Sequence, residues 1–191
     1  MKSEYEIIDN ALDVESFDNL QAWISSNTFP WYHYENVAYD EDKESHRIHQ
    51  YEDKERLNLI KAPLTKSQKD YNFALGHMIY NDGKMWCGQE TWDIISPLLR
   101  LAKVEELIRA KVNYYPKTSE IVHHKDHTDW RFEHKGALFY LNDCDGLTVL
   151  EDGTEVESVA NRLLLFDSSR PHHSTTTTNA NRRLNINLNY F

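Results

Sequence analysis

A short histidine-rich segment offers metal-binding side chains at regular spacing. Within residues 123–129, which read His-His-Lys-Asp-His-Thr-Asp, two histidines are each followed two residues later by an aspartate. On an extended backbone, residues i and i+2 project to the same side, so either His-x-Asp pair could chelate one ion. Imidazole and carboxylate ligands together suit a divalent transition metal. The residues alone leave both pairs open, His124 with Asp126 and His127 with Asp129.

A third ligand is available downstream, where His172 and His173 are adjacent. Two imidazoles and one carboxylate form the facial triad of non-haem Fe(II) oxygenases, which leaves three coordination positions open. A 2-oxo acid can fill two of these positions as a bidentate chelate, and dioxygen can take the third. Such a site needs a cation for the far carboxylate of the oxo acid. Arg183, eleven residues after His172, offers a bidentate guanidinium for that purpose.

The elements that must position these residues change character near residue 110. Downstream of it, apolar residues recur with a period near two in short segments separated by Gly, Asn and Asp, which predicts a β-sandwich or barrel. The last segment alternates strictly, so its polar residues share one face that contacts either water or a cavity. The predicted strands span residues 111–115, 136–142, 147–151, 154–159, 162–167 and 182–191.

Upstream, the pattern predicts supporting elements. A short strand at residues 5–10 precedes an amphipathic helix of about three turns that Asp13 caps. The aromatic run 31–39 favours a strand, the charged run 40–45 a loop, and residues 56–80 show a mixed pattern. Apolar residues between 90 and 110 follow a broadly helical period, which predicts helices interrupted near Pro97 and Lys103.

Composition restricts the class of protein. The chain of 191 residues, 40% hydrophobic and 12% aromatic, is long enough for one domain with a full core. No apolar run reaches the length of a membrane span, and the acidic start lacks the apolar stretch of a signal peptide. A net charge of -10 disfavours nucleic acid as a partner. With two cysteines and no disulfide framework, we expect a cytoplasmic protein.

Taken in order, a set of motifs resembles the Fe(II)/2-oxoglutarate-dependent dioxygenase superfamily, and more closely its prolyl 4-hydroxylase-like branch with small phage-type members. The resemblance runs from about residue 112 to the C-terminus, with a looser similarity over residues 5–31. The family often has Gly-Gly-x-Thr where this chain has Asp145-Gly146-Leu147-Thr148, so the geometry of that turn stays open. The motifs are Asn113-Tyr114-Tyr115-Pro116, His127-Thr128-Asp129, Phe139-Tyr140-Leu141-Asn142, Asp145 to Leu150, Leu164 to Ser168, Pro171-His172 and Arg183.

The resemblance implies two groups of site residues. The catalytic iron ligands would be His127, Asp129 and His172. The groups that contact the 2-oxoglutarate co-substrate would be Arg183, Tyr115 and Tyr140. It therefore implies Fe(II), 2-oxoglutarate and dioxygen as the cofactors and co-substrates.

Other candidate residues become less favoured once the resemblance is taken into account. His124 and Asp126 are the weaker ligand pair. His173 follows His172 directly and should point to the opposite side of a strand, so it is expected beside the ligand set or at the surface. Trp130 either lines the substrate entrance or belongs to the core.

The expected architecture is mainly β with N-terminal helices, a double-stranded β-helix or jelly-roll, formed by a single oxygenase domain over residues 1–191. Residues 1–110 would form a helical and strand support region, and residues 111–191 the metal-bearing β core. The implied activity is hydroxylation of an unidentified substrate, a prolyl or other peptide side chain or a small molecule, with no nucleic-acid or membrane partner. Two alternatives stay open: a zinc-dependent hydrolase, which has no need of Arg183, and a non-catalytic jelly-roll binding module.

Overall fold

The computed structural model describes residues 4–37, 64–130 and 132–191, and the charged run 40–45 lies outside these residues. The described chain is rich in strands and has few helices. Its helices are α1 (Val14–Ser25), α4 (Lys66–Asp70) and α5 (Gln89–Leu101). Its strands are β1 (Tyr5–Ile8), β2 (Tyr32–Tyr34), β3 (Ala74–Asn81), β4 (Lys84–Met85), β5 (Leu107–Pro116), β6 (Lys135–Tyr140), β7 (Cys144–Leu150), β8 (Glu155–Ser158), β9 (Arg162–Asp167), β10 (His172–Ser174) and β11 (Arg182–Tyr190).

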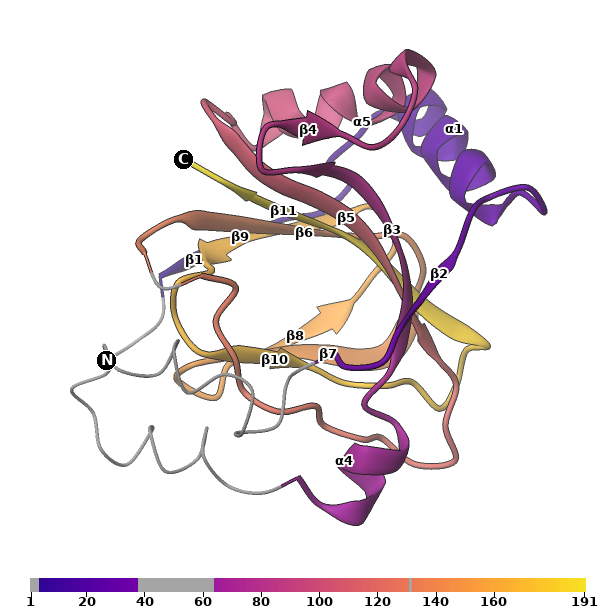
Figure 1. Ribbon diagram of the computed structural model, residues 1–191, viewed down its shortest axis with the longest axis vertical. Coiled ribbons are helices and arrows are strands. Elements are labelled where there is room, and N and C mark those ends of the chain that lie inside the picture. The colour runs from indigo at the N-terminus through magenta and orange to yellow at the C-terminus, as the bar shows by residue number, and fades with distance from the viewer. Residues whose placement is uncertain (1–3, 38–63, 131) are drawn as a thin grey trace.

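Two antiparallel sheets face each other (Figure 1). The larger sheet has the strand order β1-β9-β6-β11-β5-β3-β2, with β4 paired to β3. The smaller sheet has the order β10-β7-β8 and lies opposite the inner face of the larger one. This is the predicted architecture, mainly β with two sheets enclosing a narrow interior and helices outside.

The two faces of the larger sheet differ in chemistry because side chains alternate along each strand. The outer face carries buried apolar residues that pack against α1 and α5, which cover it in Figure 1. On the inner face, β6 and β9 contribute a smaller apolar cluster with residues of β7 and β8. The inner face of β5 and β11 is polar, and on β11 it consists of Arg183, Asn185, Asn187 and Asn189.

The N-terminal helix forms as the sequence predicts. Asp13 caps α1 by accepting a hydrogen bond from the backbone N–H of Ser16, and Leu20 and Ile24 are buried on the same face of the helix. Such a cap contributes about 0.5–2 kcal/mol. None of the helices in the described residues is both long and apolar enough to span a membrane.

The region between residues 90 and 110 differs from the prediction in two ways. Helix α5 continues through Pro97 without a break. Pro97 has no N–H for the carbonyl of Asp93, and the hydroxyl of Ser96 donates to that carbonyl instead, at 3.0 Å. The helix ends near Lys103, which has a left-handed φ of 54°, but residues 107–110 then begin strand β5 rather than extending a helix.

Strand β3 was not predicted, although it lies between β5 and the edge strand β2 in the larger sheet. Its sequence, Ala-Leu-Gly-His-Met-Ile-Tyr-Asn, mixes apolar and polar residues on both faces and contains a glycine, so it lacks the clean alternation of β11. Neighbouring strands supply its hydrogen bonds and its burial. This is an example of tertiary context deciding a segment whose local pattern is weak.

Candidate metal centre

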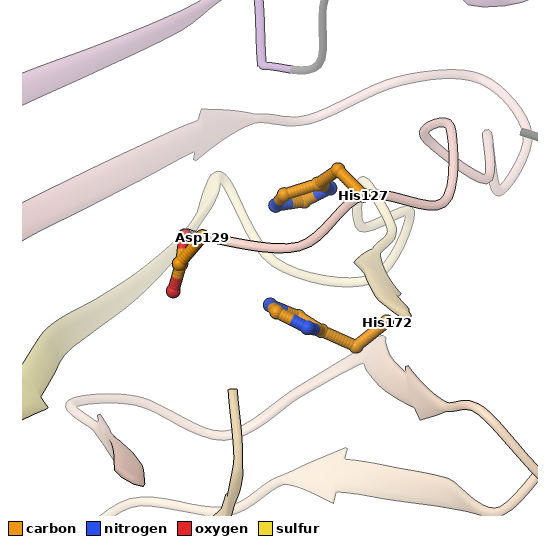
Figure 2. Close-up of side chains that lie close together, drawn as sticks. All are labelled: His127, Asp129 and His172. Atoms are coloured by element: carbon orange, nitrogen blue, oxygen red, sulfur yellow. The ribbon is translucent and has the colours of Figure 1, made fainter. Parts of the chain in front are cut away.

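Three side chains predicted as metal ligands meet at the inner face of the larger sheet. The ligand atoms of His127, Asp129 and His172 all lie within 4.8 Å of one another. Figure 2 shows both imidazole rings and the carboxylate pointing into one common space. His127 and His172 oppose each other in an isolated antiparallel bridge, in which each backbone N–H donates to the other residue's carbonyl at 3.0 Å. The backbone itself therefore fixes the spacing of the two rings.

Hydrogen bonds to the backbone orient both imidazoles. The Nδ1 of His127 lies 3.1 Å from the carbonyl oxygen of Lys125, and the Nδ1 of His172 lies 2.9 Å from that of Arg170. A carbonyl can only accept, so each Nδ1 is the donor in this contact and each Nε2 is the ring nitrogen left to bind an ion. This is the usual arrangement of metal-ligating histidines, in which one ring nitrogen donates to the protein and the other binds the ion.

The carboxylate of Asp129 is held from several sides. Its Oδ1 accepts from Nη2 of Arg109 at 2.8 Å, and its Oδ2 accepts from Oγ of Ser168 and from Nδ2 of Asn189, each at 2.7 Å. Each carboxylate oxygen has two lone pairs, so these bonds leave acceptor capacity for a metal. The donors come from β5, from the loop after β9 and from β11, which ties the ligand to three separate segments.

Protonation states at this site suit metal binding. Burial lowers the pKa of His172 to about 4, with a further contribution from neighbouring His127. Burial alone would raise the pKa of Asp129, but the Arg109 guanidinium and the two ligand histidines hold it well below its usual range. At neutral pH His172 is therefore neutral and Asp129 is an anion, which are the forms that bind a metal.

Arg183 is completely buried, with 0% of its surface exposed. Its Nε donates to Oγ of Ser158 at 2.7 Å, and its Nη2 donates to Oγ1 of Thr148 at 2.8 Å. Its Nη1 donates to the carbonyl of Thr175 at 3.2 Å. The guanidinium has five N–H groups and these contacts use three, so two can still bind a planar anion. Within the described residues no carboxylate forms an ion pair with it.

The two tyrosines predicted near the co-substrate both flank Arg183. The ring centroids of Tyr115 and Tyr140 lie 5.4 and 5.7 Å from its guanidinium carbon. The hydroxyl of Tyr140 donates to Oγ1 of Thr148 at 2.8 Å, so it shares that residue with Arg183. The structure thus brings the predicted cation and both predicted aromatic residues together on the inner face.

The turn in which an aspartate replaces the family's first glycine is ordered by that aspartate. The carboxylate of Asp145 accepts hydrogen bonds from the hydroxyls of Thr177 and Thr178 and from the backbone N–H of Thr178. The following Gly146 is required by close packing, because a Cβ there would lie 2.5 Å from Cδ of Arg183 and 2.9 Å from the carbonyl of Thr176. Glycine therefore leaves the space through which the arginine side chain runs.

The competing pair does not join the metal site. His124 is buried and its Nδ1 lies 2.8 Å from the hydroxyl of Ser174, whereas Asp126 lies 2.6 Å from Nδ1 of His173. His173 also contacts His123 and takes no part in the group of three ligands. The Nε2 of His124 is buried without a hydrogen-bond partner, in a ring 5.4 Å from that of Tyr115. An unpaired buried nitrogen beside Arg183 marks a place where a polar ligand group fits.

Several residues that support the site were not predicted. Arg109 pairs with Asp129, and its guanidinium also lies 4.7 Å from the ring centroid of Trp130. Trp130 thus packs against the arginine that holds the metal ligand. The polar alternation of β11 signalled Asn189, but Arg109 stood in a segment predicted as helix, and no local pattern linked it to Asp129.

Comparisons with known proteins add the following. No family model and no curated protein matches the sequence. Among solved structures, a Trichoplax adhaerens prolyl hydroxylase in complex with a hypoxia inducible factor peptide fragment is similar, with 19% identity, a TM-score of 0.62, and 100% of this chain and 84% of that one covered. A Pseudomonas putida prolyl-4-hydroxylase has 14% identity and a TM-score of 0.55, with 99% and 93% covered.

A viral collagen prolyl hydroxylase from Paramecium bursaria Chlorella virus-1, solved with 2OG, has 10% identity and a TM-score of 0.53, with 97% of this chain and 93% of that one covered. Each of these likenesses extends over nearly the whole described architecture, including the strands before residue 111. The chain therefore has the jelly-roll fold of the prolyl hydroxylases and other 2-oxoglutarate Fe(II) oxygenases.

Proposed function

We propose that this protein is an Fe(II)- and 2-oxoglutarate-dependent dioxygenase that hydroxylates a C–H bond of a peptide or small-molecule substrate. The proposal rests on one observation: His127, Asp129 and His172 converge on one point. On the same inner face Arg183 lies buried, and no carboxylate of the described residues pairs with it. A site that bound only a metal would not need this arginine. A site for a metal plus a dicarboxylate would.

The residues present fit the metal. Two imidazoles whose Nδ1 atoms are engaged by backbone carbonyls, together with one carboxylate, are the donor set of a facial triad, which favours Fe(II) with open positions. When bound, Fe(II) supplies the activation of dioxygen, coupled to oxidation of 2-oxoglutarate to succinate and carbon dioxide. The protein contributes the fixed positions of its ligands, through the His127–His172 backbone bridge and the three groups that bind Asp129.

The residues near Arg183 fit the co-substrate. The two unused N–H groups of the guanidinium can bind the distal carboxylate of 2-oxoglutarate as a planar fork. Tyr115 and Tyr140 exclude water from that end, and the unpaired Nε2 of His124 offers a further polar contact. A water-poor site limits side reactions of the oxidant.

Two solved structures with the same fold support a peptide substrate. One neighbour is in complex with a peptide fragment and another is a collagen prolyl hydroxylase. The fold alone does not determine the substrate, so the proposal includes small-molecule substrates as well as peptides.

The test is an anaerobic titration of the metal-free protein with Fe(II) and then 2-oxoglutarate. We expect a visible metal-to-ligand charge-transfer band that appears only with both, and slow succinate formation once oxygen is admitted. Arg183→Lys and His172→Ala should each weaken or abolish the band.

A matched control is Arg182→Lys, on the neighbouring residue whose side chain points to the other face of β11. It should leave the band unchanged. Absence of the band in wild-type protein, together with zinc-dependent hydrolysis that needs no oxygen, would favour the hydrolase and refute the proposal.

A further inference from the structure

The inner face of β5 and β11 also carries a lysine for which the described residues provide no anionic partner. Lys111 lies on β5, two residues from Arg109 on the same face, and is directly opposite Asn187 of β11. Its Nζ lies 3.7 Å from the ring centroid of Tyr34. Within the described residues no carboxylate lies in ion-pair distance of this ammonium. The side chain is partly buried, so it is shielded but still reachable.

The surroundings are shaped to hold this lysine. On the adjacent strand β3, a Cβ at Gly76 would lie 2.7 Å from Cε of Lys111 and 2.8 Å from the Tyr34 ring. The glycine therefore makes room for both side chains. Next to them, Oδ1 of Asn187 is buried without a hydrogen-bond partner, and Nδ2 of the same residue faces Asp129 at 3.4 Å. An ammonium without an anion and an amide oxygen without a donor thus lie on paired residues beside the metal ligands.

The electrostatic setting is unfavourable for an unpaired cation. Burial and, to a smaller extent, the Arg109 charge lower the pKa of Lys111 to about 8, while Asp129 opposes the change. At pH 7 the amine still carries its proton. Contact with an aromatic face offsets part of the desolvation cost, but does not replace a counter-ion.

Bound cofactors would not correct this imbalance. With the metal and 2-oxoglutarate bound, the metal, Arg109, Arg183 and Lys111 would together carry five positive charges, against three negative charges on Asp129 and the 2-oxoglutarate dianion. These groups would therefore keep an excess of two positive charges. Among the described residues, Lys111 has no carboxylate within ion-pair distance, so an anionic group of a substrate would reduce this excess.

We propose that Lys111 binds an anionic carboxylate of the primary substrate, so that the enzyme oxidises a carboxylate-bearing substrate whose reactive C–H bond lies near the metal. This inference rests on the proposed function and narrows its substrate class. The carboxylate is either the free α-carboxylate of an amino acid or the side chain of an acidic residue in a peptide. Asn187, with its free Oδ1, accepts a hydrogen bond from an N–H group of the same substrate.

The experiment compares wild-type protein with Lys111→Met, which keeps the apolar stem of the side chain and removes its charge. The control is Lys84→Met, because Lys84 makes the same kind of contact, over the Trp86 ring at 4.3 Å, on the exposed strand β4. One probe set compares each free L-amino acid with its α-amide. The other set compares pairs of blocked pentapeptides with a central proline; the two members of a pair are identical except that one has Asp or Glu where the other has Asn or Gln.

Two quantities are measured: stimulation of succinate formation, and the shift in melting temperature that each probe causes in metal-free protein. In wild-type and Lys84→Met protein, acidic members of one probe set should act at concentrations about 10- to 100-fold lower than their amides, as expected for a hydrogen bond to a charged group. In Lys111→Met this ratio should fall to within about twofold. The set that shows the effect identifies the source of the carboxylate.

Three outcomes would overturn the inference: equal action of acids and amides on wild-type protein, an acid preference that survives in Lys111→Met, or no effect of any acidic probe. A raised 2-oxoglutarate requirement in Lys111→Met with an unchanged acid preference would assign the lysine to the co-substrate and also refute it. Succinate formed without any probe still reports the proposed function, so failure of the two ideas is distinguishable.

Discussion

Strands β5 and β11 have two faces with opposite roles, although both faces belong to the same stretches of backbone. The outer face, with Val112, Ile186 and Leu188, is fully buried and packs beneath α1 and α5. The inner face is also largely buried, but apart from Tyr115 its residues are asparagine, arginine and lysine. Burial of apolar groups stabilises a fold directly, whereas burial of polar groups is tolerated only when each finds a partner.

The inner face satisfies that requirement selectively. Nδ2 of Asn113 donates to Oδ1 of Asn185 at 3.0 Å, and Asn189 donates to Asp129, so these groups are paired within the protein. Lys111 and Oδ1 of Asn187 are not paired in this way. The outer face therefore stabilises the fold. The inner face instead carries unpaired polar groups, which lower the stability of the protein and are available to bind a ligand.

The largest effect is expected from loss of the carboxylate ligand. Asp129→Ala should abolish succinate formation and weaken metal binding by more than the roughly 10- to 100-fold that loss of a group orienting a ligand costs. It also leaves the Arg109 guanidinium without its anion. Metal affinity is measured by equilibrium titration, with Ser168→Ala as the control that removes one hydrogen bond and keeps the ligand. Oxygen-dependent succinate formation that persists in Asp129→Ala would break the assignment.

An outer-face change should damage the fold and spare the site. Ile186 is fully buried, and Ile186→Ala should lower the free energy of unfolding by about 2–5 kcal/mol through lost burial and a cavity. Denaturant titration measures this loss. At low temperature the folded variant should keep its affinity for metal and 2-oxoglutarate. If metal affinity fell as strongly as stability, the two faces would not be separable.

Arg183→Lys exchanges a planar fork for a point charge on the inner face. We expect 2-oxoglutarate to bind about 10- to 100-fold more weakly, because the variant loses charged hydrogen bonds of about 1.5–3 kcal/mol, while the metal binds as before. The charge-transfer band under nitrogen gives both affinities. Wild-type affinity for 2-oxoglutarate in this variant would contradict the assigned role of Arg183.

The smallest effect concerns a histidine on the outer face. Burial lowers the pKa of His77, while its Nδ1 contact with the carbonyl of Pro30, at 3.0 Å, acts in the opposite direction. A folded state that resists protonation binds fewer protons than the unfolded chain, so stability should fall as pH drops through the unfolded pKa near 6.5. His77→Gln should reduce the difference in melting temperature between pH 7.5 and pH 5. An unchanged difference would show that other groups control it.

Local pattern predicted the strands whose side chains alternate clearly. Strand β11 and the capped helix α1 lie where the sequence places them, because one face of each is apolar and the other is polar. Strand β9 also lies at its predicted residues, although its consecutive leucines are apolar on both faces of the sheet. The same pattern failed between residues 103 and 110. There, Leu107 and Ile108 satisfy a helical period and a strand equally well, and only pairing with β3 and β11 decided for the strand.

The sequence by itself determined which residues could do the chemistry. Residue type and spacing suffice to propose a His-x-Asp pair, a downstream histidine and the guanidinium of Arg183, because those properties are local. The resemblance to a known family, and not the spacing, favoured positions 127, 129 and 172 over their neighbours. Tertiary structure alone decided which face of β11 is enclosed, that Arg109 holds Asp129 from another strand, and that no carboxylate of the described residues lies near Lys111. These facts depend on strand register and on contacts between segments far apart in the chain, and the order of residues does not encode them locally.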